Sequence, residues 1–243
     1  MLIKACLNGA RTPREHPALP LTPAALAAAG QASAAAGAQA IHMHPRDASG
    51  AQSLAPDAIG AAMRAVRAAC PGVPIGVSTL FSILPDPAQR ATTVVAWRDR
   101  PDFASVNVGE PGTPELCAAL HAHGVAIEAG LDSADAAERY VRSGLAGACL
   151  RVLIEPGESD LGAALATVAA IEAILERAGD PTPRLLHGVE PTAWPLIDAA
   201  RARGYAIRVG LEDVLTMPDG APAPDNAALV AAAVRRMSRS SRG

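Results

Sequence analysis

The sequence predicts a (β/α)8 barrel of the TIM-barrel type, formed by residues 1–243 as a single domain. Three observations carry this prediction. Short β-type runs alternate eight times with alanine-rich amphipathic segments, the chain length lies within the roughly 200–250 residues of a lean barrel, and one face of most strands is polar or small. An open, doubly wound parallel sheet is the alternative, but its strands are apolar on both faces.

The eight expected strands are short runs bounded by turn or helix signals. They cover residues 2–8, 40–45, 74–79, 103–108, 125–130, 148–154, 183–188 and 206–211. The expected helices cover residues 23–36, 54–70, 86–98, 114–123, 133–143, 159–178, 192–203 and 224–238. Thr22-Pro23 and Ser133 are typical helix starts, and Gly37 and Gly204 are typical helix ends. We expect the tail at 237–243 to be frayed or disordered.

Composition excludes several classes of protein. Half of the residues are hydrophobic but only 2% are aromatic, so the core must be built from Ala, Val, Leu and Ile. The net charge is -3 without a basic stripe, so we expect neither nucleic acid nor a membrane surface as a partner. No signal peptide and no apolar run of about 18 residues is evident, which predicts a cytoplasmic protein. Four scattered cysteines without a CxxC motif indicate reduced thiols: Cys6, Cys70, Cys117 and Cys149.

Two histidines, His42 and His44, alternate with Ile41 and Met43 in the expected strand at 40–45. Successive strand side chains point to opposite faces, so both imidazoles project from one face into the barrel interior. Two imidazoles on one face suit a metal ion such as zinc, which takes about three protein ligands in catalytic sites. Two hydrogen-bonded histidines in a polar barrel mouth are the alternative interpretation.

The last expected strand supplies a third ligand, because the eighth strand of a closed barrel lies close to the second. Glu212 shares a face with Arg208 and Gly210 at the carboxyl end of this strand, where barrel active sites form. A His₂Glu zinc site is therefore predicted, although Glu212 could instead cap the following turn. Arg208 inside a barrel needs a carboxylate partner, for which Asp213 or a substrate is expected, with Asp47 or Glu128 as the structural alternatives. Asp213 is the candidate general base.

Further candidates lie at strand ends around the same ring. Glu128, expected at the end of the strand at 125–130, either pairs with an arginine or meets the substrate. Ser78, Thr79 and Asn107 could bind the substrate or cap strand ends. The long loop "NGARTPREHPALPLTP" carries Glu15 and could form a lid. No GxGxxG, P-loop or GxSxG motif occurs in a fitting context, so nucleotide redox, P-loop and hydrolase chemistry lack support.

The segments "NGARTPREHPALPLTP", "IHMHPRD", "GVSTL", "VAIEAGLDS", "IRVGLEDV" and "DNAALV" occur in the order and approximate spacing of the β-keto acid cleavage enzymes, whose first described member is 3-keto-5-aminohexanoate cleavage enzyme. The sequence resembles this family over nearly its whole length, most specifically in the HxHxRD and RVGLED elements. The strand-four loop "NVGEPGTPE" and the strand-seven loop "HGVEPT" depart from the family pattern.

The resemblance implies a zinc-dependent (β/α)8 enzyme that condenses a β-keto acid with acetyl-CoA and releases acetoacetate and an acyl-CoA. It implies zinc ligation by His42, His44 and Glu212. It also implies an arginine–aspartate pair for proton abstraction, Arg208 and Asp213. Further functional positions that it implies are Glu128 as an acidic catalytic residue, and Ser78 and Glu15 as substrate contacts. A homo-oligomer, with a tetramer as one form, is implied as well.

Two other functions remain as alternatives. A metal-dependent barrel aldolase or lyase would act on a keto acid at the same metal site but without CoA. A barrel that binds a metal or small molecule without catalysis would also keep the site. Dependence of turnover on acetyl-CoA distinguishes the first alternative, and the effect of Asp213→Asn distinguishes the second.

Overall fold

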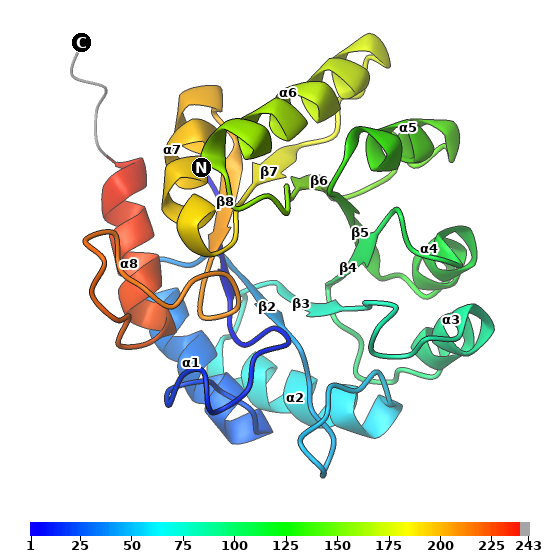
Figure 1. Ribbon diagram of the computed structural model, residues 1–243. Coiled ribbons are helices and arrows are strands. Elements are labelled where there is room, and N and C mark those ends of the chain that lie inside the picture. The colour runs from blue at the N-terminus through cyan, green and yellow to red at the C-terminus, as the bar shows by residue number, and fades with distance from the viewer. Residues whose placement is uncertain (239–243) are drawn as a thin grey trace.

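The computed structural model describes residues 1–238, which form a closed barrel of eight parallel strands inside a ring of eight α-helices (Figure 1). Each strand pairs in parallel with the next along the chain, and β8 pairs with β1 to close the sheet. The predicted (β/α)8 barrel is confirmed. The alternative prediction of an open, doubly wound sheet is wrong, because the sheet is closed.

The predicted elements are all present, with bounds that differ from the predicted ones by a few residues. The strands are β1 (Ile3–Cys6), β2 (Ala40–Met43), β3 (Ile75–Ser78), β4 (Phe103–Asn107), β5 (Ala126–Leu131), β6 (Arg151–Ile154), β7 (Arg184–Leu186) and β8 (Ala206–Val209). The helices are α1 (Pro23–Ala35), α2 (Pro56–Ala69), α3 (Pro87–Val95), α4 (Thr113–Ala122), α5 (Ala134–Arg142), α6 (Leu161–Arg177), α7 (Ala193–Arg203) and α8 (Asn226–Met237), and a 3-10 turn, η1 (Glu190–Thr192), precedes α7.

Helix ends follow the local chemistry that the sequence predicts. The hydroxyl of Thr22 accepts a hydrogen bond from the backbone N–H of Ala25, and Ser133 caps α5 in the same way. Gly204 ends α7 with a φ of 73°, a conformation that glycine adopts without steric cost. α8 ends at Met237, and the predicted disorder of 237–243 otherwise falls on residues outside the described part of the chain.

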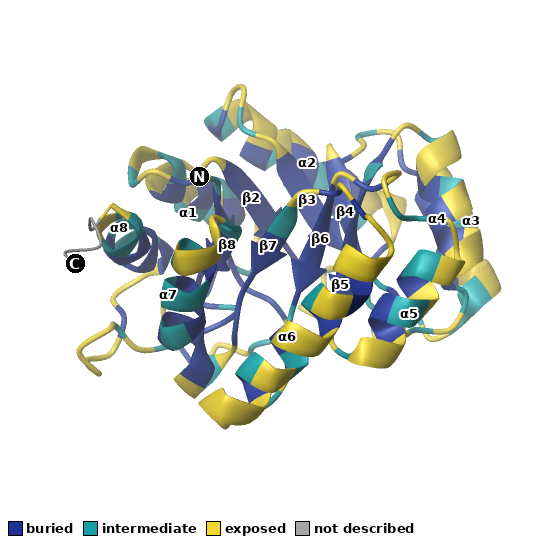
Figure 2. Ribbon diagram, turned by 90° about the horizontal axis from the view of Figure 1, so that it is seen from above, coloured by how far each residue is buried: buried dark blue, intermediate teal, exposed yellow. Residues whose placement is uncertain are grey.

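The strands carry an apolar outer face and a polar inner face. Ile41, Met43 and Val209 are buried in the core between the strands and the helices. Figure 2 shows the strands mostly buried while the helices expose their outer faces. Glu128 is the third residue of β5, so the prediction that it lies at the end of this strand is wrong. It lies inside the barrel, where its carboxylate meets the side chain of Lys4.

An aromatic ring fills the interior near the start of β4. Phe103 lies against Gly76 of β3, where an added Cβ would approach the ring to 2.1 Å. The ammonium group of Lys4 and the guanidinium of Arg151 lie 5.7 and 5.4 Å from the ring centre, at cation–π distance. This packing fills the interior at the level of Phe103. Within residues 1–238, no helix is both long and apolar enough to cross a membrane.

Candidate metal centre and active site

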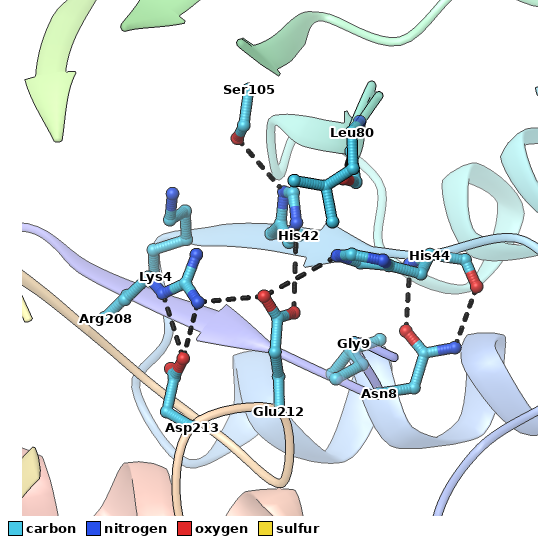
Figure 3. Close-up of polar contacts among 12 residues, drawn as sticks. Lys4, Asn8, Gly9, His42, His44, Leu80, Ser105, Arg208, Glu212 and Asp213 are labelled. Atoms are coloured by element: carbon cyan, nitrogen blue, oxygen red, sulfur yellow. Dashed lines mark hydrogen bonds and ion pairs between the residues drawn. The ribbon is translucent and has the colours of Figure 1, made fainter. Parts of the chain in front are cut away.

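Three donor groups converge at the carboxyl ends of β2 and β8, which lie on either side of β1. Nε2 of His42 lies 3.8 Å from one carboxylate oxygen of Glu212, and Nε2 of His44 lies 3.6 Å from the other. One donor atom from each residue lies within 4.8 Å of the others. Figure 3 shows the Glu212 carboxylate between the two imidazoles and the guanidinium of Arg208. The geometry brings the three predicted ligands together.

The other ring nitrogen of each histidine has a hydrogen-bonding partner. Nδ1 of His44 contacts the side-chain oxygen of Gln52, and Nδ1 of His42 lies 3.4 Å from the hydroxyl of Ser105. An acceptor at Nδ1 places the proton there and leaves the lone pair of Nε2 for a metal. Burial holds the pKa of His42 well below its usual range, so this imidazole is neutral. Neutral imidazole is the form that ligates metals.

The carboxylate of Glu212 is ionised and incompletely paired. Burial opposes its ionisation, but the charge of Arg208 holds the pKa of Glu212 well below its usual range. Its Oε2 is buried without a hydrogen-bond partner. Gly9 makes room for this side chain, because an added Cβ there would lie 2.4 Å from Cγ of Glu212. Two imidazoles and an anionic oxygen with an unused lone pair fit a divalent metal ion.

Arg208 joins the candidate metal centre to the predicted base. Its Nη2 donates to Oε1 of Glu212 at 2.8 Å, and its Nε donates to Oδ1 of Asp213 at 3.1 Å. Oδ2 of Asp213 is buried without a hydrogen-bond partner. Burial raises the pKa of Asp213 above its usual value. The predicted pairing of Arg208 with Asp213 is therefore present, and Asp47 and Glu128 are not its partners.

Glu128 lies beneath the metal centre in a buried ionic network. Its carboxylate pairs with the ammonium group of Lys4, lies 3.4 Å from Nε of Arg151 and accepts a hydrogen bond of 2.7 Å from Ser105. Burial opposes its ionisation, but these cations lower the pKa of Glu128 to about 2. Because Ser105 also contacts His42, the network holds one metal-ligand candidate in place. Of the two predicted roles of Glu128, the geometry shows the pair with an arginine.

A cavity of about 270 Å³ opens above these groups. Its lining residues are His42, His44, Ser78, Leu80, Ser105, Asn107, Asp132, Leu153, Glu155, Pro156, Gly157, His187, Val189, Arg208 and Glu212. Ser78 and Asn107 therefore lie where a substrate could contact them. Asp213 and Glu128 do not line the cavity.

Two predicted substrate contacts lie elsewhere. Thr79 is buried and donates its hydroxyl to the carbonyl oxygen of Ser105 at 2.7 Å, which ties β3 to β4. Glu15 lies on the exposed loop after β1, outside the lining of the cavity. Hydrogen bonds from Thr12 lower the pKa of Glu15. The loop still reaches the site, because Arg11 contacts Glu15 and donates to the backbone oxygen of Glu212.

Sequence analysis did not identify five residues that lie in or beside the site: Lys4, Gln52, Ser105, Glu155 and His187. The sequence could have indicated a buried role for Lys4, because it is the only lysine of the chain and lies within an apolar strand. Ser105 shares a strand face with Phe103 and Asn107. Gln52 had no such signal, since it follows a turn after β2.

The fold and the site define a (β/α)8 barrel with a candidate His₂Glu metal centre and a buried arginine–aspartate pair. The sequence profile of the beta-keto acid cleavage enzyme family matches residues 1–242. The chain therefore belongs to this family, as its sequence motifs predicted. No match was found among curated protein sequences.

Solved structures show the same fold. The ternary complex of ObcA with a C4-CoA adduct and oxalate has a TM-score of 0.73 at 19% identity, over 91% of this chain and 64% of ObcA. The binary complex of ObcA with oxaloacetate has a TM-score of 0.71 at 20% identity, over 90% and 63% of the two chains. The native KDPGal structure has a TM-score of 0.60 at 18% identity, over 97% and 94%. The chain spans just under two thirds of the length of ObcA.

Removal of one candidate ligand should weaken metal binding. We expect His42→Ala to lower the affinity for a divalent metal more than about 100-fold, and Gln52→Leu to lower it by about 10- to 100-fold, the range for a residue that orients a ligand. Competition with a chromophoric chelator measures both affinities. His121→Ala, at an exposed histidine of α4, is the control and should bind like the native protein. Equal affinities of His42→Ala and His121→Ala would exclude this centre.

The Lys4–Glu128 pair should matter for stability. Lys4→Met leaves the buried Glu128 with Arg151 and Ser105 only, so we expect the free energy of unfolding to fall by about 3 kcal/mol. Adding Glu128→Gln removes the uncompensated charge, so the double variant should lose less than the sum of the two single losses. Urea unfolding of the four proteins measures this cycle. Strict additivity would show that the pair is not coupled.

Proposed function

We propose that this protein is a zinc-dependent β-keto acid cleavage enzyme. It condenses a β-keto acid with acetyl-CoA and releases acetoacetate and the CoA ester of the remaining acyl group. The observation that carries the proposal is the convergence of His42, His44 and Glu212 beside the Arg208–Asp213 pair, in a chain that belongs to this family. A His₂Glu donor set favours zinc among the divalent metals.

The relatives support the choice of substrates. ObcA binds oxaloacetate, which is itself a β-keto acid, in one structure, and a C4-CoA adduct with oxalate in another. The cavity of about 270 Å³ is close to the lower limit for small-ligand pockets, so it accommodates a short keto acid. The bulk of CoA would then lie outside the cavity, with its thioester end in the mouth.

Three residues would hold the metal: His42, His44 and Glu212. A zinc ion there supplies Lewis-acid polarisation of the keto and carboxylate oxygens of the substrate. Gln52 and Ser105 keep the imidazoles oriented through their Nδ1 atoms. Ligand geometry is thereby set before the substrate binds.

Asp213 is the proposed base. Its Oδ2 has no hydrogen-bond partner, so it can accept the proton from the carbon between the keto and carboxylate groups. Arg208 holds Oδ1 of the same carboxylate and stabilises its charged form. Asp213 is only 1% exposed, so the substrate carbon must come within reach of Oδ2 beside Arg208. Ser78 and Asn107, which line the cavity, would orient the two substrates by hydrogen bonds.

The proposed reaction requires both substrates. With a panel of β-keto acids, we expect an acyl-CoA and acetoacetate to form only when acetyl-CoA is present, which chromatographic separation of CoA esters measures. Consumption of a keto acid in the absence of acetyl-CoA would contradict the proposal and favour a metal-dependent lyase.

Asp213→Asn removes the proposed base while keeping the shape of the side chain. We expect kcat to fall by about 10²- to 10⁴-fold with the metal content unchanged. Asp219→Asn, at an exposed aspartate of the segment after β8, should keep native turnover. If Asp213→Asn turned over as fast as Asp219→Asn, the base would be another group.

A further inference from the structure

Three residues form the wall of the cavity that faces the candidate metal centre: Asp132, Glu155 and His187. Asp132 follows β5, Glu155 follows β6 and His187 follows β7. In a closed ring of eight strands, β6 lies opposite β2, which carries the two candidate metal-binding histidines. None of these three residues takes part in the proposed chemistry.

Contacts with neighbouring residues fix the position of the Glu155 side chain in this wall. Its Oε1 lies over Gly130, where an added Cβ would approach it to 2.2 Å, so only glycine leaves room for the carboxyl group. Its Oε2 lies 3.2 Å from Nε2 of His187. The side chain of Glu155 is 17% exposed and that of His187 is 3% exposed. The carboxyl group is therefore held by three neighbouring strands, and it borders the cavity.

Among the described residues that line the cavity, no lysine or arginine forms an ion pair with Glu155, although the charges of Arg208 and Lys4 act on its carboxyl group from a distance. Arg208 is the one arginine in the lining, and its guanidinium already bonds Asp213 and Glu212. Burial lowers the pKa of His187 to about 3, so its imidazole is neutral. Burial raises the pKa of Glu155 to about 7. A cation placed against this carboxyl group would favour its ionised form, whereas a second anion would be repelled.

We propose that Glu155, positioned by His187, determines specificity by binding a cationic group on the R group of the keto acid. The site then selects a β-keto acid that carries an ammonium group at the end remote from its carboxylate, and it rejects one that carries a second carboxylate there. This inference rests on the proposed function, because the substrate carboxylate is taken to face the metal centre. Asp132, on the same wall, adds negative charge that acts in the same direction.

Three β-keto acids of equal chain length test the proposal, with an ammonium, a methyl or a carboxylate group at the remote end. Calorimetry measures their binding to the metal-loaded protein without acetyl-CoA, and a parallel assay measures turnover with acetyl-CoA. We expect the native protein to bind the ammonium compound about 10- to 100-fold more tightly than either other compound. Equal binding of all three, or a preference for the carboxylate compound, would overturn the proposal, and this comparison needs no variant.

Glu155→Gln removes the charge and keeps the shape of the side chain. In this variant we expect the dissociation constants of the ammonium and methyl compounds to come within about threefold of each other. Glu158→Gln is the matched control, because it removes the same charge from the same loop outside the lining of the cavity. A Glu155→Gln protein that kept the native preference, or that lost all three compounds equally, would exclude Glu155 as the specificity contact.

The two readouts separate this inference from the proposed reaction. A charge preference in binding without any turnover would contradict the reaction and leave the role of Glu155 standing. Turnover with acetyl-CoA without any charge preference would support the reaction and overturn the role of Glu155.

Discussion

The guanidinium of Arg208 is the interaction on which the candidate active site depends. It bonds two carboxylates that are adjacent in the chain, those of Glu212 and Asp213, in a region that excludes most water. Without this cation, two buried carboxylates side by side would not both ionise, because like charges and burial raise their pKa values together. A carboxylate must be ionised to bind a metal, as proposed for Glu212, and it must be ionised to accept a proton, as proposed for Asp213. One side chain of β8 thus serves both proposed roles.

A second buried ionic network, formed by Lys4, Glu128 and Arg151, lies next to the site that contains Arg208. Lys4, Glu128 and Arg151 come from three different strands and meet around Phe103 in the interior of the barrel. Burying these charges costs free energy that the pairing must offset, so the network is weak evidence for extra stability. Its geometric consequence is clearer, because Ser105 links Glu128 to the imidazole of His42. The network therefore connects the packed interior to the candidate metal centre.

The fold and the metal-binding triad could be predicted because they follow from periodicity and barrel closure. Alternation in β2 placed His42 on the interior face, and closure brought β8 near β2. Alternation along the strand does not by itself place Glu212, because β8 ends at Val209 and Glu212 lies in the turn that follows. Close approach of Gly210 to the carbonyl of Cys6, where an added Cβ would lie 1.9 Å from the oxygen, shapes the turn that carries Glu212 inward.

The remaining features depend on contacts between loops and strands that no single segment of sequence encodes. Thr79 bonds the backbone of β4 rather than facing the cavity, and Glu128 lies in mid-strand because β5 continues to Leu131. Gly130 belongs to β5 and Glu155 follows β6, and their close approach follows from the register of these two strands.

The central claim is a metal centre formed by two histidines and one glutamate. An X-ray absorption spectrum at the metal edge of freshly purified protein tests it most directly. For zinc, we predict two imidazole nitrogens and at least one carboxylate oxygen at about 2.0–2.2 Å. A sulfur ligand at about 2.3 Å, or protein that retains no metal after purification, would contradict the account.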